Sequence, residues 1–136
     1  MQPIDYAKAA GLAILVLMLD FAVAFLVVAF YSLAIDPGHP QAYYEAAALS
    51  ITPWSTRVAG PILFFLAIWG TGRRRPERNP WAFALATFFF YLVVDFALVG
   101  FGFGAVLTLP VALTLLAKLA GALAGAAVVS RARRTS

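Results

Sequence analysis

The sequence predicts an all-α integral membrane protein with four transmembrane helices, and three observations lead to this fold class. Hydrophobic residues make up 63% of the 136 positions and charged residues 12%, whereas roughly a quarter of the residues in soluble proteins are charged. Four apolar runs are long enough to cross a bilayer. The basic residues form two clusters, and an even number of crossings brings both to the same side of the membrane.

The four apolar runs are expected to form one transmembrane domain over residues 1–136. They cover residues 9–35, 53–71, 81–103 and 105–130. The first run is longer than the roughly 7 to 15 residues of a signal-peptide core, so we expect it to be retained as a helix. The last two runs are divided only by Phe101 to Gly104, and one helix across both would be about twice the length needed to span. A tight turn is therefore expected at Phe101 to Gly104.

The distribution of arginine predicts the topology, because positively charged loops stay in the cytoplasm. The connection at 72–80 and the C-terminal tail hold most of the positive charge, and the connection at 36–52 has no Lys or Arg. The sequence therefore predicts a multi-pass protein of the cell inner membrane, with both termini and the 72–80 loop in the cytoplasm. The same loop can attract anionic lipids of the inner leaflet, through Arg73, Arg74, Arg75 and Arg78.

The predicted outer loop at 36–52 contains Asp-Pro-Gly and His-Pro turn signals. The stretch QAYYEAAAL after them is expected to form a short helix at the membrane interface, and Pro53 is expected to open the second spanning helix. His39, Glu45 and Arg57 are candidates for an outer vestibule. The alternative is that they are ordinary solvated loop residues, with the Arg57 side chain reaching to the lipid headgroups.

An internal duplication is the next feature of the sequence. Residues 6–25 align without gaps with residues 81–100, and six of the twenty paired positions are identical. Agreement among Ala, Leu and Phe arises easily in so apolar a chain, but the shared acid pairs Asp20 with Asp95. The alignment predicts two parallel helical hairpins, related by a pseudo-twofold axis along the membrane normal.

Lys118 is a third charge inside a predicted span. From the predicted inner boundaries and a rise of about 1.5 Å per residue, Asp20, Asp95 and Lys118 lie roughly 18, 22 and 20 Å deep. A charge at the centre of a spanning helix costs about 2.5 to 3.5 kcal/mol to insert. Pairing among the three reduces this cost, so we expect them to form a cluster near the midplane.

Two polar stripes flank these charges. Thr114, Lys118, Gly121 and Gly125 share one helical face, and the two glycines form the GxxxG spacing that lets helices approach closely, here most simply within one subunit. On the preceding helix Tyr91 lies one turn before Asp95. Tyr91 and Thr114 are therefore further candidates for the midplane site.

The cluster has two interpretations. It can be an ionic clasp that holds the helices together, or its excess carboxylate can bind a proton or exchange it for a cationic substrate. The leading hypothesis is a small membrane transporter or proton- or cation-coupled permease; the alternative is a non-catalytic accessory or assembly subunit of a larger membrane complex. The chain is similar to small proton-coupled exporters in size and in the acid on its first helix, although it contains no motif of theirs. A homo-oligomer or a partner membrane subunit is expected.

Several function classes are disfavoured by composition. The chain has no cysteine, which excludes disulfides and thiol chemistry, and its single histidine argues against a metal or haem site, so no cofactor is expected. No Ser/His/Asp arrangement suggests an enzyme. The net charge of +4 is explained by topology, so nucleic acid is not an expected partner.

Overall fold

The computed structural model describes residues 1–103 and 107–135, and in these ranges the chain is helical, without strands. The helices are α1 (Pro3–Phe30), which continues into a π-helical segment η1 (Tyr31–Ile35), α2 (Gln41–Arg73), α3 (Pro80–Phe103) and α4 (Leu109–Arg134). Within the described residues these make four segments that are long and apolar enough to cross a membrane. The predicted all-α class and number of spans are confirmed for this part of the chain.

The starts of α1 and α3 follow from local sequence. The Gln2 backbone N–H donates to Asp5 Oδ2 at 3.0 Å, and Pro3 stands in the first turn, where its missing N–H costs nothing. Asn79 Oδ1 accepts from the backbone N–H groups of Trp81 at 3.0 Å and Ala82 at 3.3 Å. Each acceptor satisfies N–H groups that have no partner within the helix.

The start of α2 corrects the predicted 36–52 loop. The helix begins at Gln41, so the connection is only residues 36–40, and the stretch expected to lie at the interface is the first part of α2. Pro53 lies inside the helix instead of opening it. The helix formers of QAYYEAAAL outweigh the proline, and membrane helices tolerate proline because neighbouring groups satisfy the freed carbonyl.

The other boundaries differ in smaller ways. The first helix begins at Pro3, before the predicted residue 9, and α4 runs on to Arg134 through the basic tail. The expected turn at Phe101 to Gly104 is wrong for its first three residues, which belong to α3, and Gly104 lies outside the described residues. Glycine at position 102 does not end the helix, because it has apolar helix-compatible neighbours on both sides.

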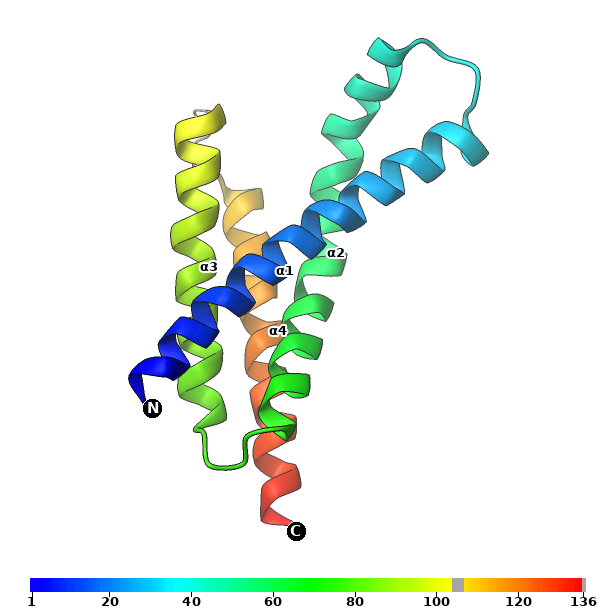
Figure 1. Cartoon of the computed structure of the whole chain (residues 1–136). Helices are drawn as coiled ribbons and strands as arrows, with labels where there is room; N and C mark the ends of the chain where they lie inside the picture. Colours follow the sequence, from blue (N-terminus) through cyan, green and yellow to red (C-terminus); the bar gives the residue numbers. More distant parts are fainter. Residues whose placement is uncertain (104–106, 136) are drawn as a thin grey trace.

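The helices pack as an open bundle (Figure 1). Both termini lie at the same end as the connection between α2 and α3, and at the opposite end the α1–α2 hairpin diverges from α3 and α4 (Figure 1). The core is formed by small residues of α1 and α4 against aromatic residues of α2 and α3, among them Ala13, Ala122, Phe64 and Tyr91. Many large apolar side chains point outward, as expected where lipid replaces water.

Close approach of α2 and α4 explains the glycines of this interface. A Cβ atom on Gly125 would lie 2.8 Å from the carbonyl oxygen of Phe65, and one on Gly121 would overlap the backbone of Pro61. A Cβ on Gly72 would lie 2.8 Å from the Val129 side chain. The GxxxG spacing of α4 therefore packs against α2 of the same chain.

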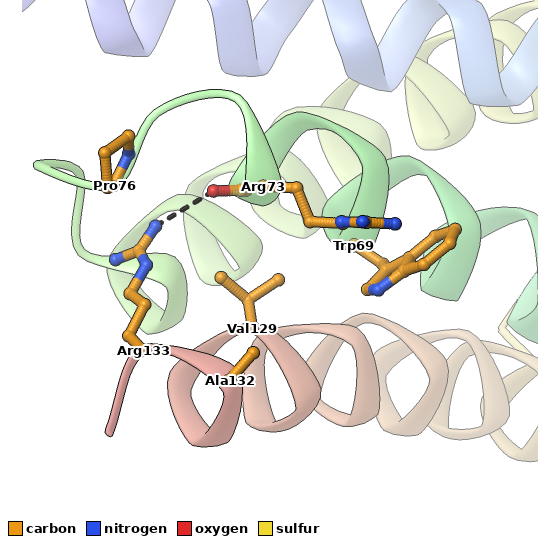
Figure 2. A pocket seen from close by; sticks show the side chains of 7 residues that line it. Trp69, Arg73, Pro76, Val129, Ala132 and Arg133 are labelled. Atoms are coloured by element: carbon orange, nitrogen blue, oxygen red, sulfur yellow. Dashed lines mark hydrogen bonds between the residues drawn. The ribbon is translucent and has the colours of Figure 1, made fainter. Parts of the chain in front are cut away.

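Arg133 joins the end of α4 to the α2–α3 connection. Its guanidinium donates to the carbonyl oxygens of Gly72 at 3.0 Å, Arg75 at 2.9 Å and Arg78 at 2.6 Å. Figure 2 shows the Arg133 side chain pointing from α4 towards this connection. The Gly72 carbonyl is at the C-terminus of α2, where carbonyls lack partners within the helix. Arg133 donates to it from α4 and also to two carbonyls of the connection, and so holds the connection in place.

Candidate functional site

The centre of the site is a direct contact between Asp20 on α1 and Lys118 on α4. Lys118 Nζ donates to Asp20 Oδ2 at 2.7 Å, although the two residues are 98 positions apart. Asp20 is 5% exposed and Lys118 is 3% exposed. The pair is thus buried inside the bundle, where a charge without a counter-charge would be costly.

Tyr91 on α3 is the second partner of the ammonium group. Lys118 Nζ donates to the Tyr91 hydroxyl oxygen at 2.5 Å and also lies 4.7 Å from the centre of the tyrosine ring. The Phe64 ring packs edge-on against Tyr91, with ring centres 5.0 Å apart. The Phe64 contact orients the Tyr91 ring, and the Tyr91 hydroxyl gives the ammonium group a polar neighbour at the edge of that ring.

The remaining helix, α2, leaves room for the lysine side chain. Gly60 on α2 faces the stem of Lys118, and a Cβ at this position would lie 2.8 Å from Lys118 Cγ and still closer to Cε. The lysine side chain therefore crosses the α2–α4 interface over a glycine. The sequence carries no signal that distinguishes Gly60 from the other glycines, so this residue was missed.

Asp95 lies beside the pair but is not bonded to it. It is on α3, one helical turn from Tyr91, and it is half-buried. Within residues 1–103 and 107–135 it forms neither a hydrogen bond nor an ion pair, but it interacts electrostatically with Lys118 and Asp20. The two acids that the alignment pairs therefore differ in their contacts: one is bonded to Lys118 and the other acts on it through space.

Asp20 itself keeps one free oxygen. Asp20 Oδ1 is buried and has no hydrogen-bond partner among the described residues. A buried carboxylate oxygen without a donor of its own is costly, and this carboxylate is stabilised instead by Lys118 through Oδ2 and by its interaction with the Tyr91 hydroxyl. Oδ1 can accept a proton at little further cost in desolvation.

Thr114 is the predicted site residue that does not reach the cluster. Its hydroxyl donates to the Pro110 carbonyl oxygen of its own helix at 2.9 Å, one turn from Lys118. Serine and threonine in helices commonly bond back in this way. Thr114 therefore lies on the predicted stripe but adds no contact to the charged pair.

The three outer candidates lie in separate contacts. His39 Nε2 is 2.9 Å from Asp36 Oδ1, and Glu45 accepts from the Gln41 side chain at 2.8 Å. Arg57 lies 4.9 Å from the centre of the Trp54 ring. The structure therefore does not bring the three predicted vestibule residues together.

A cluster around Asp36 occupies this end of the molecule instead. Tyr43 donates its hydroxyl to Asp36 Oδ2 at 2.6 Å, and the Tyr44 hydroxyl donates to the Asp36 carbonyl oxygen at 2.8 Å. The hydrogen bond from Tyr43, followed by that from His39, holds the pKa of Asp36 below its usual value of 3.8. The adjacent tyrosines after the Asp-Pro-Gly turn were the available signal for this cluster.

The four arginines of the α2–α3 connection have different surroundings. Arg73, Arg74 and Arg75 are exposed, whereas Arg78 is buried, with Nε 3.0 Å from Asp5 Oδ1 on α1. Its guanidinium also lies 4.0 Å from the centre of the Phe83 ring. Arg78 was expected to contact lipid together with the other three arginines, but its side chain is packed within the bundle.

No protein-family model, curated protein or solved structure matches this chain. The class of protein to which the chain belongs is therefore inferred from its fold. The length and apolarity of its helices are those of a multi-pass membrane protein, with a buried contact of an acid, a base and a tyrosine inside the bundle.

Proposed function

We propose that the protein is a small transporter, a proton- or cation-coupled permease that uses the cluster of Asp20, Lys118, Tyr91 and Asp95. The observation that carries this proposal is the unpartnered oxygen of Asp20, in a carboxylate that is 5% exposed. Two carboxylates and one ammonium group leave one excess negative charge. A proton or a small cation is the ligand that would neutralise it.

A proton on Asp20 Oδ1 would change the contacts of Lys118. The carboxyl group becomes neutral, its attraction for the ammonium group falls, and Lys118 is drawn towards Asp95, which already acts on it electrostatically. Loss of the proton restores the bond to Asp20. Because Asp20 is on α1 and Asp95 is on α3, this exchange would move the ionic partner of α4 from α1 to α3, to which Lys118 is also bonded through Tyr91.

The finer topology belongs to the same proposal. We place the protein in a cell inner membrane, with both termini and the α2–α3 connection in the cytoplasm, because that end carries the arginine-rich segments (Figure 1). The two hairpins are related as parallel repeats, and a homo-oligomer completes the transport pathway. The shared acid of Asp20 and Asp95 supports the repeat.

The second candidate is a non-catalytic accessory or assembly subunit, in which the same charges are structural. The observation that favours it is the tight fit of Lys118, which bonds Asp20 at 2.7 Å and lies against Gly60 along its stem. A lysine held on these sides is suited to fixing the packing of α1, α3 and α4.

Infrared titration in lipid separates the two candidates. For the transporter we expect a protonated-carboxyl band that titrates in the neutral range in the wild type and is lost in Asp20→Asn or Asp95→Asn. Glu45→Gln, which removes a carboxylate outside the cluster, is the matched control and should leave the band unchanged. Proteoliposomes under a pH gradient should then show proton flux that both cluster variants abolish.

The opposite result would favour the accessory subunit. If both carboxylates stay ionised through the neutral range and proteoliposomes show no flux, the cluster is a structural clasp. A second membrane protein that co-purifies in a stoichiometric amount would then identify the complex to which the subunit belongs.

A further inference from the structure

A hollow of about 350 Å³ lies between α1 and the end of α2, separate from the charge cluster. Its rim is basic and carries Lys8, Arg74 and Arg75, and part of its wall is apolar, formed by Gly11, Leu12 and Leu15 of α1. The lining of the hollow combines two regions of the fold. Lys8 and the apolar residues are on the first turns of α1, and the arginines follow the end of α2.

The charges on the rim are not all neutralised by the protein. Arg78, which also borders the hollow, pairs with Asp5, and Arg75 is 3.6 Å from Glu77. Lys8 and Arg74 form no ion pair with any residue in the described ranges. Because no acidic residue among those the structure describes lines the hollow, its described lining carries a net positive charge.

The apolar wall runs from this rim towards the interior of the membrane. Leu15 is seven residues beyond Lys8, which is about 10 Å along the helix axis, and it is 51% exposed. A Cβ atom on Gly11 would have no atom within 4 Å, so this glycine leaves the wall open. The hollow thus has positive charge at one end and an apolar surface one to two turns deeper.

We propose that this hollow binds one anionic phospholipid. The phosphate lies between Lys8 and Arg74, where a guanidinium can donate two hydrogen bonds to its oxygens. One acyl chain lies along Gly11, Leu12 and Leu15. A free phosphate would gain the charge contacts alone, whereas a lipid also covers the apolar wall, so the arrangement fits a lipid better.

The hollow on the other side of α2 provides an internal control. It measures about 510 Å³ and is bordered by Trp69, Arg73 and Arg133 (Figure 2). Arg133 is bonded there to backbone carbonyls, and Arg73 lies 4.8 Å from the centre of the Trp69 ring. Arg73 and Arg74 are neighbours in sequence but border different hollows. Substituting each in turn therefore distinguishes a specific lipid site from general attraction to an anionic surface.

The test is native mass spectrometry of the purified protein with phosphatidylglycerol and, separately, phosphatidylcholine of the same acyl chains. We expect one phosphatidylglycerol to be retained in preference to phosphatidylcholine. Lys8→Gln and Arg74→Gln should each lower this retention about fivefold, the factor that one basic residue near an anionic surface contributes. Arg73→Gln should retain the lipid as the wild type does. Equal losses in Arg73→Gln and Arg74→Gln, or no preference between the lipids, would overturn the proposal.

A second pair of variants tests the apolar wall with every charge in place. Gly11→Leu adds an apolar side chain to the wall of the hollow at a position where the new Cβ has no atom within 4 Å. Gly70→Leu is the control, because a Cβ on Gly70 is equally unobstructed and Gly70 borders neither hollow. We expect Gly11→Leu alone to reduce lipid retention. Millimolar inorganic phosphate should leave the bound lipid in place. Retention unaffected by Gly11→Leu, or displacement by phosphate, would show that the occupant is recognised by charge alone and would refute the lipid site.

Discussion

At the scale of single residues, the Lys118 side chain of α4 contacts each of the other three helices. It contacts Asp20 of α1, Tyr91 of α3 and the open position at Gly60 of α2. Removing one partner of a buried ion pair costs more than removing both, because the remaining charge stays buried without compensation. The stability of the protein should therefore show strong coupling between Asp20 and Lys118.

A double-mutant cycle measures this coupling. Asp20→Asn should destabilise the protein by about 3 to 5 kcal/mol, because it leaves the Lys118 ammonium group unpaired. Asp20→Asn combined with Lys118→Met should recover much of that loss, as followed by unfolding in mixed detergent micelles. Asp95→Asn is the control and should cost much less, because Asp95 is half-buried and has no direct bond to Lys118. Equal costs for the two acids would contradict the assigned pair.

The contacts of Asp36, in the connection between η1 and α2, predict that the local stability of this connection depends on pH. The hydrogen bonds from Tyr43 and His39 lower its pKa below 3.8. Its stabilising contribution is therefore fully present above pH 3.8 and is lost as the pH falls through the lowered native value. The protection of the 36–45 backbone amides against hydrogen exchange, expressed relative to their intrinsic exchange rates, should fall over that range, and Asp36→Asn should remove the dependence. An exchange rate that follows the same curve in Asp36→Asn would assign the effect to another group.

At the scale of elements, the interface of α2 and α4 is the closest in the bundle. The glycines of these two helices are not interchangeable. A Cβ on Gly121 would overlap backbone, one on Gly60 would overlap a flexible lysine stem, and one on Gly70, which lies outside the interface, would have no atom within 4 Å. Backbone cannot move aside as a lysine stem can. The effect of adding one methyl group should therefore follow this order.

Three alanine substitutions test the order. Gly121→Ala should cost about 1 to 3 kcal/mol, the usual range for overpacking, because the helices must separate. Gly60→Ala should cost less, since Lys118 can shift, although its bonds to Asp20 and Tyr91 weaken. Gly70→Ala should be neutral or stabilising, because alanine is the better helix former. Thermal unfolding in detergent gives the three values, and a Gly70 variant as unstable as the Gly121 variant would disprove the packing argument.

At the scale of the whole molecule, the absence of cysteine makes the orientation directly measurable. Single cysteines at Gln41 and at Glu77 lie at opposite ends of α2 and its following connection, and both positions are exposed. In intact cells an impermeant maleimide should label Gln41→Cys and leave Glu77→Cys unlabelled until the membrane is opened. Labelling of Glu77→Cys in intact cells would reverse the proposed topology.

The sequence and the structure agree best where local chemistry decides. The number and type of spans follow from apolar length. The similar depths that residue counting predicts for Asp20 and Lys118 are compatible with their contact. The loop at 36–52 was predicted wrongly because proline was given more weight than the helix formers around it. The outer candidates His39, Glu45 and Arg57 share only a region of the sequence, which does not require their side chains to meet.

Composition and helix length are enough to predict that the chain is helical, that its helices within the described ranges are long and apolar enough to cross a membrane, and that their internal charges need partners. The identity of those partners depends on the packing of the helices. Lys118 bonds Asp20 and Tyr91 and not Asp95, its stem lies over Gly60, and Arg78 turns inward to Asp5. The physical reason is that helix rotation and tilt are set by packing between helices. Packing joins residues far apart in the chain, and no local pattern contains that information.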